Sequence, residues 1–129
     1  MKEDMQEKYM EYQMLMQQMQ QLRENNTALE KHVAVLFELK ENLNKISSVK
    51  PESDTLVTLG NGVFFNAQIK ECKKVIMNVG AGVFLEKNMD NAISVVDKQM
   101  NEVAAVLSEI KDEINKTSNK IYQLQKETN

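Results

Sequence analysis

Tryptophan is absent from this 129-residue chain, which also has one proline, four glycines and only 5% aromatic residues. So few large aromatic side chains do not build a round hydrophobic core. Apolar residues still make up 42% of the sequence, and charged residues 27%. Helices that lie side by side bury only a narrow seam, and sequences rich in seven-residue repeats have this composition. The length is that of one domain, and we expect residues 1–129 to form one.

Cysteine is equally scarce, and Cys72 is the only one. A single thiol excludes an intrachain disulfide framework and a zinc site of four cysteines. It also favours a reducing compartment, so we expect a cytoplasmic protein. Three lysines lie near Cys72 in the sequence and leave a reactive thiol open, but the favoured interpretation is an ordinary loop residue.

No segment is strongly basic or long and apolar. Residues 1–46 carry eight acidic and six basic side chains, residues 47–87 four and five, and residues 88–129 seven and five. This balance argues against a nucleic-acid partner. No run approaches the roughly 18–20 apolar residues of a membrane span, and the N-terminus lacks a basic-then-apolar signal, so we expect no membrane association.

Two long heptad patterns flank the middle of the chain. Steps of four and three residues select Met1, Met5, Lys8, Tyr12, Leu15, Met19, Leu22, Asn26, Leu29, Val33, Leu36, Lys40 and Leu43, and later Met89, Ile93, Val96, Met100, Val103, Leu107, Ile110, Ile114, Thr117, Ile121, Leu124 and Thr128. Ten of the first thirteen positions are apolar or tyrosine, and ten of the last twelve are apolar. This alternation predicts coiled-coil helices over residues 1–48 and 88–129.

The boundaries of these helices are also legible. Pro51 and the serines before it end the first helix, and Asn88 is a suitable N-cap for the second. A compact insertion between the helices returns the chain to its starting point, so we expect antiparallel pairing within one chain. Parallel pairing of two chains is the alternative. Asn26 lies at a seam position, where it either fixes the register, the favoured interpretation, or marks a point where the helices splay.

The insertion, residues 54–87, contains a repeated phrase. Leu59–Phe64 and Val79–Phe84 each read as an apolar residue, Gly-x-Gly and Val-Phe, 20 positions apart. Each predicts a β-hairpin whose turn uses residues that accept a positive φ angle, namely Gly60, Asn61 and Gly62 in the first and Gly80 and Gly82 in the second. The predicted fold is therefore α+β and predominantly α, a long antiparallel coiled-coil hairpin with two β-hairpins inserted between the helices.

Two short hairpins are marginal alone, and their apolar side chains favour assembly with other subunits. Period-two alternation puts most of these side chains on one face, with Phe64 and Phe84 on the other. The candidate oligomerisation residues are Val57, Leu59, Val63, Phe64, Phe65, Ile69, Val75, Met77, Val79, Val83, Phe84 and Leu85.

Methionine is concentrated at the N-terminus, with six of nine in the first 19 residues. Met10, Met14 and Met16 fall outside the seam. Flexible, polarisable methionines suit a surface that adapts to many partners. Burial against another helix of an oligomer is the less favoured alternative. In an antiparallel pair the end of the second helix lies at the same tip, and the candidate binding residues are Met1, Met5, Tyr9, Met10, Met14, Met16, Ile121, Tyr122 and Leu124.

Catalytic groups are few. His32, the only histidine, falls beside the seam, where a solvated role is favoured over a general base or a metal ligand. No nucleophile–base pair or carboxylate pair has a pocket to occupy. Neither Gly-x-Gly turn has the third glycine and following helix of a dinucleotide site. We predict no enzyme activity, no metal and no cofactor.

With these residues in view, the chain resembles the α-type subunit of the prefoldin chaperones. The resemblance rests on Leu56–Phe64, on Val75–Lys87 and on the helix opening Asn88–Ile93, between the two heptad arms. The β-type subunit of that family has a single hairpin, so two hairpins indicate the α type.

The resemblance implies a hexamer of two α-type and four β-type subunits, joined through their hairpins. Its coiled-coil tips would hold unfolded client proteins without ATP and deliver them to a group II chaperonin. The competing hypothesis is a structural coiled-coil scaffold that binds one fixed, folded partner. The helix rise of about 1.5 Å per residue places the tips roughly 60 Å from the hairpins.

Overall fold

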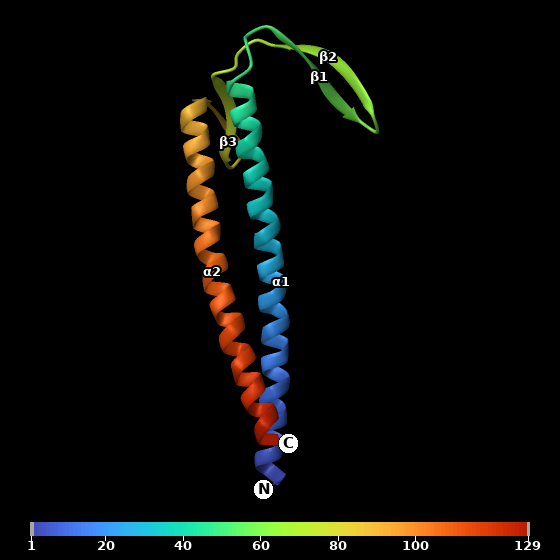
Figure 1. Ribbon diagram of the computed structural model, residues 1–129, viewed down its shortest axis with the longest axis vertical. Coiled ribbons are helices and arrows are strands. Elements are labelled where there is room, and N and C mark those ends of the chain that lie inside the picture. The colour runs from blue at the N-terminus through green and yellow to red at the C-terminus, as the bar shows by residue number, and fades with distance from the viewer. Residues whose placement is uncertain (1, 129) are drawn as a thin grey trace. The chain divides into compact units, whose positions relative to one another are not determined.

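The computed structural model describes residues 2–128. Helix α1 (Lys2–Ser47) is followed by strands β1 (Ser53–Gly60), β2 (Val63–Ile69), β3 (Lys74–Gly80) and β4 (Val83–Asn88), and then by helix α2 (Met89–Thr128). Figure 1 shows this order. The fold class predicted from the sequence is therefore confirmed. The chain divides into two compact units, a first unit of Met1–Val35 with Met100–Asn129 and a second unit of Leu36–Gln99.

The predicted seam contains most of the buried side chains of each helix, and Ala92, 0% exposed, is buried beside it. From Lys8 to Leu43 every predicted seam position is buried or half-buried, and so is every one from Met89 to Leu124. In the first unit the two helices run antiparallel, because Lys8 Nζ lies 3.5 Å from Glu127 Oε2 while Glu30 Oε1 lies 4.0 Å from Lys111 Nζ. In the second unit Lys40 Nζ lies 2.6 Å from Asp97 Oδ1. The heptads therefore pair within one chain.

Asn26 takes part in a polar network at the seam of the first unit. Its Nδ2 donates to Glu30 Oε1 at 3.2 Å, the same oxygen that lies 4.0 Å from Lys111 Nζ on α2. Its Oδ1 is buried and has no hydrogen-bond partner. Turning the amide over would place its oxygen against the Glu30 carboxylate, so the network fixes the amide orientation. This link to the opposite helix supports a role for Asn26 in register.

Both helix boundaries follow local signals in the sequence. The backbone N–H of Asn91 donates to Asn88 Oδ1 at 2.8 Å, so Asn88 is the N-cap of α2, as predicted. At the end of α1 the hydroxyl of Ser47 donates to the carbonyl of Asn44 at 2.7 Å. The hydroxyl of Ser48 likewise donates to the carbonyl of Lys45 at 2.8 Å, and Pro51 prevents the helix from continuing.

The two hairpins of the second unit are separate antiparallel pairs, β1 with β2 and β3 with β4. Their turns repeat in detail, with φ angles of 106°, 49° and 78° at Gly60, Asn61 and Gly62, and 117°, 51° and 74° at Gly80, Ala81 and Gly82. The predicted positive-φ turns are therefore present in the structure. A side chain added at any of the four glycines would meet no atom within 4 Å, so the requirement for glycine is purely conformational.

Each hairpin also carries a β-bulge that the alternation pattern did not predict. Thr58 pairs with Phe64 and Gly60 with Val63, which leaves Leu59 without a partner of its own, and Val79 is left in the same way in the second hairpin. A side-chain oxygen two residues before the glycine accepts its N–H in both, from Thr58 at 3.1 Å and from Asn78 at 3.0 Å. The 20-residue repeat is therefore structural as well as sequential.

The two turns differ in one residue: the second hairpin has Ala81 where the first has Asn61. A left-handed φ costs alanine about 1 kcal/mol, and asparagine adopts it more readily. We expect Ala81→Asn to slow amide hydrogen exchange in β3–β4 about threefold, and Asn61→Ala to accelerate it in β1–β2 by a similar factor. If the exchange rates of both hairpins stay the same, or change in the opposite directions, the explanation by the cost of a left-handed φ angle is wrong.

Replacing Asn26 separates stability from register. Asn26→Leu removes a buried, unsatisfied oxygen and adds apolar burial. We therefore expect the unfolding free energy to increase by about 1–3 kcal/mol, and the melting temperature measured by circular dichroism to rise. It also removes the Glu30 tether, so carbodiimide cross-linking of Glu30 to Lys111, mapped by mass spectrometry, should decrease. Asn25→Leu, one residue away on the exposed surface, is the matched control and should change neither. A lower melting temperature with an intact cross-link would refute this role.

Candidate functional site

The first turns of α1 expose a cluster of large apolar side chains, which we call the tip cluster. Its members on α1 are between 45% and 69% exposed, and they are Met5, Tyr9, Met10, Met14 and Met16. Among these side chains only Tyr9 forms a hydrogen bond within the described residues, in which its hydroxyl accepts from Gln13 Nε2 at 3.3 Å. Methionine side chains are unbranched and flexible, so the surface can adapt to different shapes.

The end of α2 contributes less surface than the sequence suggested. Tyr122 is 55% exposed, and Lys126 Nζ lies 4.7 Å from its ring centroid. Ile121 is half-buried, and Leu124 is 8% exposed because it packs in the seam. Of the three predicted α2 residues, Tyr122 is therefore the one available on the surface while the seam is closed.

Met5 differs from its prediction as a seam residue, because it is 51% exposed. The reason is the level at which α2 ends. Glu127, one residue before the last residue of α2, pairs with Lys8, and Gln125 Nε2 donates to the hydroxyl of Tyr12 at 3.4 Å. Within the described residues 2–128, the part of α1 before Lys8 therefore has no full turn of α2 opposite it. Met1, the other predicted member, lies outside the described residues.

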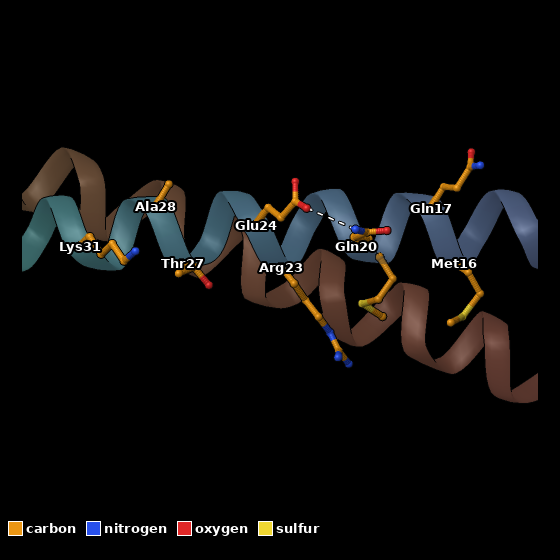
Figure 2. A pocket seen from close by; sticks show the side chains of 9 residues that line it. Met16, Gln17, Gln20, Arg23, Glu24, Thr27, Ala28 and Lys31 are labelled. Carbon is orange, nitrogen blue, oxygen red and sulfur yellow. Dashed lines mark hydrogen bonds between the residues drawn. The ribbon is translucent and has the colours of Figure 1, made fainter.

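A groove follows the tip cluster along α1. It has a volume of about 680 Å³ and is lined by Met16, Gln17, Met19, Gln20, Arg23, Glu24, Thr27, Ala28 and Lys31. Figure 2 shows Met16, Arg23 and Thr27 along one edge of the helix and Gln17, Glu24 and Ala28 along the other. All nine residues except Met19 are exposed, so α2 leaves this side of α1 uncovered.

The hairpins of the second unit expose a second apolar surface. The register puts Leu56 on the same face as Phe64, and Ile76 on the same face as Phe84, and all four are between 55% and 74% exposed. On the opposite faces Val57, Phe65 and Leu85 are exposed to a lesser degree, while Ile69, Val75 and Met77 are half-buried. At the turns Leu59, Val63, Val79 and Val83 are exposed.

Leu56 and Ile76 are surface residues that the sequence reasoning did not select. The signal was available, because they are 20 residues apart and each precedes its turn glycine by four positions. Phe37 and Leu39 on α1 are also exposed, at 53% and 40%, and were not selected. Their heptad positions outside the seam are what could have identified them.

The remaining candidates have ordinary surroundings. Cys72 is 3% exposed between the two hairpins, and His32 is exposed. Within residues 2–128 no three His, Cys, Asp or Glu side chains are grouped so that they could hold a metal ion. In the same part of the chain, neither helix has an apolar stretch long enough to cross a membrane.

Comparison with curated proteins points to one family. A relative from Methanococcus aeolicus, "Prefoldin subunit alpha", is 34% identical over 98% of this chain and 86% of its own length. Proteins of the same description from Nitrosopumilus maritimus and Pyrococcus horikoshii are 35% and 33% identical, over 74% and 89% of this chain and 70% and 83% of their own lengths.

Comparison with solved structures shows the same fold. A chain of filamentous prefoldin from Methanocaldococcus jannaschii, determined by cryo-electron microscopy, gives a TM-score of 0.75 at 18% identity, covering 89% of this chain and 95% of that chain. The family model described as "Prefoldin subunit" matches residues 15–129. The chain therefore belongs to the prefoldin family of molecular chaperones, and the family resemblance drawn from its hairpins is confirmed.

Proposed function

We propose that this chain is a subunit of an ATP-independent holdase that binds non-native polypeptides at the tip cluster. The observation that carries the proposal is the exposure of Met5, Tyr9, Met10, Met14 and Met16 together on one stretch of helix. An unfolded chain offers apolar side chains in no fixed geometry, and a methionine surface can bury them without a fixed pocket. No nucleotide is required for such binding, because burial of apolar surface supplies the free energy.

Assembly through the hairpins is the second part of the proposal. The hairpin faces carry exposed apolar pairs in the same register, and both strands of each hairpin are edge strands. Such strands favour pairing with other chains. By analogy with the relatives described as alpha subunits, we propose that the partners are β-type prefoldin subunits in a hexamer of two α-type and four β-type chains. Delivery to a group II chaperonin and a cytoplasmic location complete the proposal.

Substitution of the tip cluster tests client binding. Met10→Gln with Met14→Gln removes two exposed apolar side chains and keeps good helix-forming residues. We expect the assembled complex to bind an unfolding client about tenfold more weakly, which corresponds to about 1.4 kcal/mol. Light scattering of the aggregating client measures this loss.

Val106→Gln is the matched control, since Val106 is also an exposed apolar residue, on α2 of the same unit. It should leave protection from aggregation unchanged. Equal protection by the wild type and the double variant would overturn the assignment of the tip. Saturable binding of one folded protein, with no preference for unfolded chains, would instead support the structural scaffold.

The hairpin faces are tested by assembly. Phe64→Ser with Phe84→Ser removes one exposed aromatic ring from the equivalent position of each hairpin. We expect native mass spectrometry after co-expression with a β-type subunit to show mostly unassembled chains, while circular dichroism shows unchanged helix content. Gln68→Ser, an exposed polar position on β2, should assemble normally. Complete hexamers from the double variant would contradict this assignment.

A further inference from the structure

The groove beside the tip cluster has a chemistry that the cluster lacks. Residues 12–22 contain no charged side chain, whereas the groove is lined by charged Arg23, Glu24 and Lys31 as well as by apolar Met16, Met19 and Ala28. Glu24 accepts a hydrogen bond from Gln20 Nε2 at 3.4 Å. Within residues 2–128 neither Arg23 nor Lys31 has an ion-pair partner. The groove therefore offers two uncommitted cations beside apolar surface.

The length of the groove along α1 suits a helical partner. From Met16 to Lys31 the rise of α1 is about 22 Å, or roughly four turns, and Arg23 and Lys31 are about 12 Å apart along the axis. A helix lying alongside α1 would place side chains between its ridges, and carboxylates about two turns apart on that helix would reach both cations. Helices recognised in apolar grooves present such stripes of anchors with a charged flank.

We propose that this groove docks amphipathic, transiently helical segments of non-native polypeptides that carry acidic residues along one edge of the apolar stripe. The proposal rests on the proposed function and names the class of client that it favours. Continuity supports this occupant, because Met16 belongs both to the tip cluster and to the groove. Charge complementarity supports the acidic flank, since the groove has two cations against one anion in a chain whose overall net charge is −3.

Two labelled peptides test the proposal. One is a 16-residue amphipathic helix with a leucine stripe and two glutamates eight residues apart beside it, and the other has glutamine in place of both glutamates. Fluorescence anisotropy measures their binding to the full chain in its assembled complex. We expect the acidic peptide to bind three- to tenfold more tightly, and we expect 0.5 M salt to remove most of that preference.

Variants of the chain locate the effect. Arg23→Gln and Lys31→Gln should each reduce the preference for the acidic peptide, and together they should abolish it while binding of the glutamine peptide is retained. Both residues are exposed on a helix, and glutamine is a good helix former, so folding should be unaffected. Lys98→Gln is the matched control, an exposed lysine of α2 in the second unit. It should leave the preference intact.

The outcomes separate this proposal from the holdase function. Equal binding of both peptides, or a preference that survives the double variant, overturns the groove proposal, while continued protection of an aggregating client leaves the holdase function standing. If the wild-type complex binds neither peptide and does not protect an aggregating client, the groove proposal and the holdase function are both overturned. Self-association of the chain in sedimentation velocity that Arg23→Gln abolishes would identify a second copy as the occupant and would also overturn the proposal.

Discussion

The seam between α1 and α2 is the constraint on which the rest of the structure depends. It follows the alternating heptad positions from Lys8 to Leu43 on α1 and from Met89 to Leu124 on α2. A seam this narrow buries mainly the apolar residues at heptad positions, and Ala92 is a further buried residue beside them. Most other large apolar side chains on these helices therefore face solvent or another molecule, and this explains why Met10, Met14, Phe37 and Tyr122 are all exposed.

Polar groups at the seam set its register, which apolar packing alone specifies weakly. Lys40 and Lys8 keep their aliphatic stems at seam positions and pair with Asp97 and Glu127 on α2. Exposed pairs of this kind add little to stability. Their value lies in selecting one alignment of two helices whose heptads would tolerate a shift by seven residues. We infer that Asn26 contributes to the register in the same way, at a cost in stability because its Oδ1 has no partner.

Features that repeat with a fixed period could be predicted from the sequence. Features that depend on which residues of a neighbouring element lie opposite could not. Heptads predicted the seam, and Gly-x-Gly predicted both turns. The exposure of Met5 depends on where α2 ends relative to Lys8, which no period records. The bulges at Leu59 and Val79 break the alternation and were not predicted. Leu56 and Ile76 were overlooked because they lie on the face opposite Val57 and Met77, where only Phe64 and Phe84 were selected. The groove was missed because it follows from what α2 leaves uncovered.

Exposed apolar surface occurs here on two kinds of backbone, and the difference matters for function. The backbone groups of a helix are satisfied internally, so an apolar ligand that leaves the tip cluster exposes no unpaired N–H or carbonyl. Each two-stranded hairpin instead has unpaired backbone groups along its outer edges as well as exposed Phe64 or Phe84. Separation of a partner from such an edge exposes both kinds of group at once. Reversible binding therefore suits the helices, and permanent assembly suits the hairpins.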